Sequence, residues 1–171
     1  SITKLSHIHF AALQRYADRI VQLGEDPKRV IVSGAPGLDN LGTMDLLGQD
    51  ELEQRYGIRM GDSGTLLITY HPVTLEYEQT ETQVRELLKA LDKMDLGLIF
   101  TYTNADTSGR LVLDMIRDFV GRREGAYIVE NLGTQAYFST MALVQAMVGN
   151  SSSGIIESAS FKLPVVNIGR R

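Results

Sequence analysis

A small, polar segment, Gly149–Gly154, separates an apolar run at 142–148 from a predicted helix. If the apolar run is a buried strand, this segment lies at the carboxyl edge of a parallel sheet, where open sheets hold ligands. Its serine hydroxyls and the N–H groups at the helix start suit an anion. Glu157, one to two turns into the helix, cannot attract a phosphate but can accept hydrogen bonds from a sugar diol. The segment, called the serine turn below, therefore predicts a nucleotide diphosphate site, although a capped helix without a ligand explains these residues equally well.

Three further polar residues each follow a predicted strand and are expected at the same edge of the sheet. His71 can donate to a phosphate or move a proton near neutral pH. Asn104 occupies the equivalent place after the next strand, and the guanidinium of Arg171 suits phosphates. Taken singly, each residue has an ordinary explanation that is as good or better. His71 could be bonded to backbone beside a proline, Asn104 could lie in a turn, and Arg171 could be solvated at the surface. Their convergence on one edge favours a ligand site.

No other arrangement in the sequence predicts a reaction centre. His7 and His9 are spaced to face one side of a strand, but no third ligand of suitable type is near them in the sequence. A buried or interfacial histidine pair is therefore favoured over a metal site, and no metal is predicted. The sequence lacks the usual motifs of NAD, P-loop, zinc-protease and hydrolase sites, which are G-x-G-x-x-G, G-x-x-x-x-G-K-S/T, H-E-x-x-H and G-x-S-x-G.

Composition sets the broad class of the protein. A chain of 171 residues with 43% hydrophobic and 22% charged residues can bury a core. The net charge of −4 and the pI near 5.4 argue against nucleic-acid binding, which requires a basic surface. The chain has no cysteine, which excludes disulfides, thiol nucleophiles and thiolate metal sites. No apolar stretch approaches a membrane span and residues 1–7 lack a secretion signal, so the expected location is the cytoplasm.

Short apolar runs alternate with segments of helical periodicity over most of the chain. Residues 84–94 and 111–119 each place apolar side chains on one helical face, and Thr134 is expected to cap a later helix. Alternation of this kind predicts an α/β fold with a Rossmann-like parallel sheet, and runs that are apolar on both faces require helices on both sides. The expected strands are 30–32, 66–70, 97–102, 126–129, 147–148 and 164–168.

The first part of the chain departs from this alternation. An amphipathic helix at 13–21 leads into the strand at 30–32, and the Gly- and Pro-containing segment 34–41 breaks regular structure before a weaker, polar helix at 48–56. One helix and one strand cannot bury each other. The predicted organisation is the end of one α/β domain at 1–41, a linker and connecting helix at 42–64, and most of a second domain at 65–171.

Six segments carry a family resemblance: KLSHIHF at 4–10, GEDP at 24–27, GAPGLD at 34–39, TYHPVT at 69–74, GNSSSGIIE at 149–157 and LPVVNIG at 163–169. In this order they resemble the UDP-N-acetylglucosamine 2-epimerases, and they cover nearly the whole chain. The non-hydrolysing branch has H-R-R-E-N where this chain has HPVT at 71–74, and D-S-G-G where it has NSSS at 150–153. The resemblance is therefore to the hydrolysing branch, which makes N-acetylmannosamine or a diacetylated analogue for sialic-acid-type sugars.

The resemblance implies two Rossmann-like halves of the glycosyltransferase-B type, with UDP held mainly by the second half. The family reaction removes the C2 proton and expels UDP to give a glycal, after which water adds at C1 and C2 is protonated from the opposite side. It implies UDP and a UDP-N-acetylhexosamine as ligands, without a metal or redox cofactor. By motif, Ser151 and Ser152 would bind the diphosphate, Glu157 the ribose hydroxyls, and Asn104, Arg171 and His71 would complete the nucleotide side, His71 being a tentative catalytic residue.

Most of the family's first half, with its acid and base carboxylates, has no counterpart in this chain. The chain alone is therefore expected to be inactive and to bind UDP weakly at best. Two alternatives stay open: a nucleotide-sugar-dependent glycosyltransferase of the same two-half architecture, and a non-catalytic UDP-binding module. The sequence also leaves open one or two acetamido groups on the sugar, the end product, and a homodimer or homotetramer for the full-length protein.

Overall fold

The computed structural model describes residues 2–72, 78–102 and 107–169. The chain forms two compact units, Ser1–Met44 and Asp45–Arg171. Each is described by itself. Asn104 and Arg171 lie outside the described residues, so their predicted roles stay predictions.

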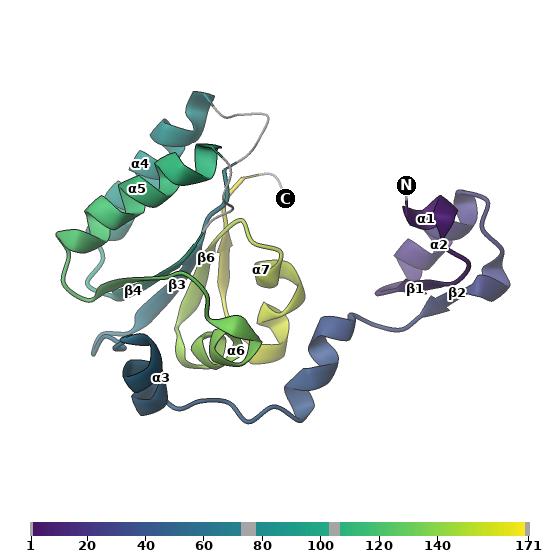
Figure 1. Ribbon diagram of the computed structural model, residues 1–171, viewed down its shortest axis with the longest axis horizontal. Helices are drawn as coiled ribbons and strands as arrows, with labels where there is room; N and C mark the ends of the chain where they lie inside the picture. Colours follow the sequence, from purple (N-terminus) through teal and green to yellow (C-terminus); the bar gives the residue numbers. More distant parts are fainter. Residues whose placement is uncertain (1, 73–77, 103–106, 170–171) are drawn as a thin grey trace. The chain divides into compact units, whose positions relative to one another are not determined.

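The second unit is built on a five-stranded sheet in which each strand runs parallel to its neighbours (Figure 1). The spatial order is β5-β4-β3-β6-β7. The strands predicted from the apolar runs are all present, with every bound within one residue of the prediction. They are β3 (Thr65–Thr69), β4 (Gly97–Thr101), β5 (Ala126–Val129), β6 (Ala146–Gly149) and β7 (Val165–Asn167).

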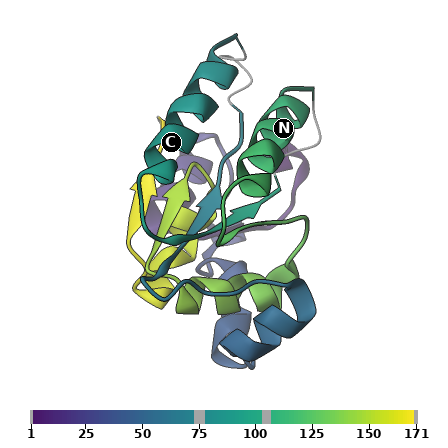
Figure 2. The ribbon, with the colours of Figure 1, turned by 90° about the vertical axis from the view of Figure 1, so that its left-hand side faces the viewer.

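Helices cover both faces of this sheet, as the sequence predicts (Figure 1). On one face α4 and α5 lie side by side, which the rotated view also shows (Figure 2). On the other face α6 contacts α3 and the 3-10 turn that follows α7. The helices are α3 (Gln49–Tyr56), α4 (Thr80–Asp92), α5 (Thr107–Gly121), α6 (Gly133–Leu143) and α7 (Ser153–Ile156), with the 3-10 turn at Ser158–Phe161.

Side chains of the central strands alternate between the two layers, because successive residues of a strand point to opposite faces. Leu66 and Ile68 belong to the core under α4 and α5, where Phe100 and Phe119 meet edge to face at 5.9 Å. Leu67 lies between these two residues in β3 and is also fully buried. The sheet is therefore covered on both sides, which explains why its strands read as continuous apolar runs.

The first unit is a small parallel pair of strands with one longer helix. β1 (His9–Ala11) pairs with β2 (Val30–Val32), and α2 (Gln14–Gln22) packs against both strands. Phe10 is 66% exposed, and Ile31 and Val32 are also exposed. The unit also contains α1 (Ile2–Leu5) and 3-10 turns at Pro27–Arg29 and Pro36–Gly42.

Several local predictions are corrected by the structure. The apolar run 142–148 is not one strand, because Ala142 and Leu143 end α6 before β6 begins. Thr134 does not cap α6; the helix already starts at Gly133, whose N–H donates to Oδ1 of Asn131 at 2.8 Å. Met94 lies beyond the end of α4 and is exposed. The segment 34–41 is not irregular throughout, since most of it forms a 3-10 turn.

Arg123 ties the end of α4 to the segment after α5. Its guanidinium donates to the carbonyl oxygens of Leu91 at 2.5 Å, Met94 at 2.6 Å and Leu96 at 3.0 Å. Leu91 lies in the last turn of α4, and Met94 and Leu96 follow the helix, so one planar donor group joins the helix end to the segment that leads into β4.

We expect Arg123→Ala to lower the free energy of unfolding by about 2 kcal/mol, because charge-assisted hydrogen bonds are lost. Arg123→Lys should lower the free energy of unfolding by a smaller amount, since an ammonium group can make only some of the hydrogen bonds of the planar guanidinium. Urea unfolding measures both variants, with exposed Arg110 changed to Ala as the control. A loss below about 0.5 kcal/mol for Arg123→Ala, typical of a neutral surface change, would contradict the assignment.

Candidate functional site

The order of the strands places the predicted site residues at a switch point of the sheet. From β3 the chain proceeds outward through β4 and β5, and α6 then returns it to β6 on the other side of β3. Parallel sheets bind ligands where the winding direction reverses, outside the carboxyl ends of the two strands involved. His71 follows β3, and the serine turn begins at the last residue of β6. The structure therefore brings together two segments that are distant in the sequence.

Gly149 allows the ends of β3 and β6 to approach closely. It has φ +144°, and a Cβ atom there would lie 1.9 Å from the carbonyl oxygen of Thr69. The same carbonyl accepts a hydrogen bond from the N–H of Asn150 at 3.1 Å. Only glycine fits this position, because every other residue has a Cβ atom.

Asn150 connects the serine turn to His71. Its Oδ1 accepts a hydrogen bond from the N–H of His71, and its Nδ2 donates to the His71 carbonyl oxygen, both at 2.7 Å. The Asn150 residue is only 6% exposed. Sequence reasoning missed this role: the polar composition of the turn is visible in the sequence, but a contact across 79 positions has no local signal.

The serine turn leads into a helix that is shorter than the sequence predicts. Ser152 is exposed, and Ser151 and Ser153 are half-buried, so their side chains border solvent. The Ser151 hydroxyl accepts from the N–H of Ser153 at 3.3 Å, and the Ser152 carbonyl accepts from Ile155 and Ile156, each at 2.9 Å. A single turn has a small macrodipole, so the hydroxyls and individual N–H groups are the main anion-binding features here.

Glu157 ends α7 instead of lying one to two turns inside a helix. Its residue is half-buried, while its Oε2 atom is buried and has no hydrogen-bond partner among the described residues. A buried acceptor without a donor is costly unless a ligand satisfies it. Gly154 holds this turn against the sheet, since a Cβ there would lie 3.0 Å from Cγ1 of Val165.

The structure thus places four of the six predicted site residues. His71, Ser151, Ser152 and Glu157 belong to two segments that meet at the switch point, and the backbone of His71 is bonded to the residue next to Ser151. Within residues 2–72, 78–102 and 107–169, no group of three His, Cys, Asp or Glu side chains could hold a metal ion. Among the same residues, no helix has the length and apolar composition that crossing a bilayer requires.

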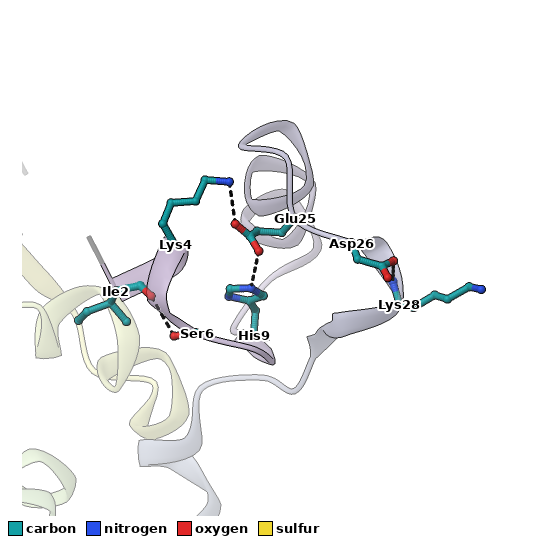
Figure 3. A network of polar contacts seen from close by, with 7 residues as sticks. All are labelled: Ile2, Lys4, Ser6, His9, Glu25, Asp26 and Lys28. Carbon is teal, nitrogen blue, oxygen red and sulfur yellow. Dashed lines mark hydrogen bonds and ion pairs between the residues drawn. The ribbon is translucent and has the colours of Figure 1, made fainter.

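A separate polar cluster lies in the first unit (Figure 3). Oε1 of Glu25 accepts a hydrogen bond from Nζ of Lys4 at 2.8 Å. Oε2 of the same carboxylate lies 3.2 Å from Nε2 of His9. The two histidines do not face one side of a strand as predicted and are not a buried pair, because His7 is exposed and outside the strand, whereas His9 is buried at the start of β1. The hydrogen bond from Lys4 is the main cause that lowers the pKa of Glu25 from its ordinary value of 4.5, and His9 lowers the pKa further.

Comparison with known proteins tests the resemblance. The model of the UDP-N-acetylglucosamine 2-epimerase family matches residues 1–171. The chain belongs to this family. The prediction made from the six segments is therefore confirmed, and the solved structures below show which fold the family shares.

Among the curated relatives, the GDP/UDP-N,N'-diacetylbacillosamine 2-epimerase (hydrolyzing) of Campylobacter jejuni is 41% identical over 173 residues. The UDP-N,N'-diacetylbacillosamine 2-epimerase (hydrolyzing) of Legionella pneumophila is 36% identical over 171 residues. The UDP-N-acetylglucosamine 2-epimerase of Neisseria meningitidis is 30% identical over 171 residues. Each match covers the whole chain but only 44–45% of the relative, so the chain spans less than half the length of these epimerases.

Two solved structures show the shared fold. The Neisseria meningitidis UDP-GlcNAc 2-epimerase bound to UDP-GlcNAc gives a TM-score of 0.77 at 15% identity, covering 99% of this chain and 46% of that one. The S. aureus MnaA–UDP co-structure gives a TM-score of 0.75 at 19% identity, covering 98% of this chain and 43% of that one. The α/β fold predicted from the sequence is therefore the fold of this epimerase family.

We expect Gly149→Ala to destabilise the protein by about 4 kcal/mol, because the new methyl group meets the Thr69 carbonyl and the backbone is strained. Thermal and urea unfolding measure the loss. Gly121→Ala is the matched control, since a Cβ at Gly121 has no neighbour within 4 Å. Equal stability of the two variants would show that the ends of β3 and β6 are not packed as described.

We expect Lys4→Met to lower the melting temperature at neutral pH and to have little effect in acid. A carboxyl group with a lowered pKa in the folded state stabilises the protein above its unfolded pKa, near 4.5, and this contribution disappears as the pH falls through the folded value. Thermal unfolding between about pH 3 and pH 7 tests this. Lys28→Met is the control, because Lys28 is exposed and its side chain has no ion pair within the described part of the chain. A pH-independent effect of Lys4→Met would contradict the contribution of Glu25.

Proposed function

We propose that this chain is part of a hydrolysing UDP-N-acetylglucosamine 2-epimerase, which converts UDP-N-acetylglucosamine or a diacetylated analogue to an N-acetylmannosamine-type sugar and UDP. In this proposal residues 1–41 end the first Rossmann-like domain, 42–64 form a linker and connecting helix, and 65–171 form most of the UDP-binding domain. The exposed apolar side chains Phe10, Ile31 and Val32 support the first assignment, since the rest of that domain would cover them.

The observation that carries the proposal is the buried Oε2 of Glu157 beside the serine turn, which has no hydrogen-bond partner in the part of the chain that the structure describes. In the proposed complex this oxygen accepts hydrogen bonds from the ribose hydroxyls of UDP, which supply the missing donors. The hydroxyls of Ser151 and Ser152 donate to the diphosphate. Asn104, Arg171 and His71 complete the nucleotide side of the site.

This arrangement would favour loss of the leaving group. When the C2 proton is removed and the C1–O bond breaks, the electron pair of that bond stays on the departing UDP. Donors that meet the diphosphate bind this growing charge more strongly in the transition state than in the substrate, which lowers the barrier. His71, at the end of β3, is proposed to act as a donor or proton carrier at the same site. The acid and base carboxylates belong to the remaining part of the full-length protein, so the chain alone is expected to be inactive.

The relatives favour a diacetylated sugar. The relative at 41% identity is named for GDP/UDP-N,N'-diacetylbacillosamine and the one at 36% for UDP-N,N'-diacetylbacillosamine, whereas the relative named for UDP-N-acetylglucosamine is 30% identical. A protein named for polysialic acid biosynthesis is 32% identical and supports a place in the synthesis of sialic-acid-type sugars. A homodimer or homotetramer of the full-length protein stays a prediction.

We expect Glu157→Gln in the full-length protein to weaken UDP binding about 10- to 100-fold, because hydrogen bonds to a charged acceptor are lost. The loss should be much smaller with 2'-deoxy-UDP, which lacks one of the two hydroxyls. The double variant Ser151→Ala, Ser152→Ala should weaken the binding of UDP and of 2'-deoxy-UDP equally. Isothermal titration calorimetry measures these affinities.

Glu124→Gln is the control, since Glu124 is an exposed glutamate away from the turn. Unchanged UDP affinity in both the Glu157 variant and the double serine variant would overturn the proposed site. A protein that binds UDP but transfers the sugar to an acceptor, and releases no free sugar, would overturn the proposed reaction.

A further inference from the structure

We infer that Asn150 is a positioning residue for His71, a role that rests on the proposed function of this site. The side-chain amide fixes the backbone of His71 at the end of β3 while its own backbone opens the serine turn. The distance between the imidazole and the diphosphate-binding turn is then set by one residue.

The register of the sheet shows how this works. The ladder between β3 and β6 ends at the pair Thr69 and Gly149. One residue later the N–H of Asn150 still donates to the Thr69 carbonyl at 3.1 Å, but the main chain of β6 then turns away. The Asn150 side chain replaces the missing strand backbone, since its amide offers a donor and an acceptor in one plane, as a peptide group does.

In this chain both contacts are made by one amide. The N–H of His71 needs an acceptor and its carbonyl oxygen needs a donor, and Asn150 supplies both at 2.7 Å. An aspartate of the same shape keeps the acceptor but turns a second carboxylate oxygen toward the His71 carbonyl, where two acceptors repel each other. Because Asn150 is 6% exposed, little water is available to separate them.

The role of Asn150 is therefore to fix the position of the His71 imidazole relative to the serine turn. If the imidazole acts on the leaving group, a shift of about 1 Å in its position reduces the rate on the order of 100-fold. The serine turn is also anchored by the Ser153 N–H on the Ser151 hydroxyl and by the close packing of Gly154 on Val165. UDP affinity should consequently suffer less than turnover when the Asn150 amide is changed.

The test is a double-mutant cycle in the full-length enzyme. Asn150→Asp should lower kcat about 10- to 100-fold with UDP affinity changed less than about 3-fold. In a His71→Ala background the same substitution should lower kcat by less than about 2-fold, because the residue to be positioned is absent. Asn131→Asp is the matched control, since that exposed asparagine accepts from the N–H of Gly133 and not from that of His71.

A second measurement does not depend on turnover. In protein labelled with carbon-13 at the histidine rings, Asn150→Asp should shift the His71 resonance, identified by its loss in His71→Ala, and Asn131→Asp should not. An equal loss of kcat in both backgrounds, or an unmoved His71 resonance, would overturn the inference. If His71→Ala alone leaves kcat unchanged, the proposed role of His71 in the reaction fails, and the resonance shift then decides whether Asn150 positions it.

Discussion

The candidate site depends on how closely two parallel strands end beside each other. β3 and β6 are neighbours in space, but along the chain β4, β5 and the helices α4, α5 and α6 lie between them. At their carboxyl ends the Gly149 backbone lies against the Thr69 carbonyl without space for a side chain. This contact fixes where the serine turn begins, and the Asn150 amide extends the contact to His71. The turn and the histidine therefore share one rigid support, provided by the sheet core under α4 and α5.

The strands and the type of fold could be predicted because the signal is local. A buried parallel strand such as Leu66–Ile68 is apolar on both faces, and helical periodicity separates it from the next strand. Element ends were less accurate. The N-cap residue of α6 is Leu132, not Thr134, and the first N–H of the helix donates to the side chain of Asn131, since a favourable residue type does not show which nearby residue bonds the free N–H.

The site was predicted in composition but not in geometry. His71 and the serine turn do meet at the switch point, as the sheet edge predicted. The expected helix after the turn is only one turn long, and Glu157 ends it, so binding would rely on individual donors and acceptors more than on a helix dipole. The Asn150 bridge and the Glu25 cluster could not be predicted, because both join residues that are distant in the sequence and leave no periodic pattern. Family resemblance, in contrast, assigns proposed roles to residues whose spacing alone carries little information.

The packing of Gly149 also affects how variation in this family should be interpreted. A position where even a methyl group is excluded will be retained in any homologue that keeps the two strands adjacent, whether or not that homologue still catalyses a reaction. A retained glycine would therefore show that the two strands still pack together, and not that the protein is catalytic. Asn150, which follows it, is held by hydrogen bonds to His71 and not by the exclusion of a Cβ atom, so its identity in a diverged paralogue would be the more informative marker of preserved chemistry.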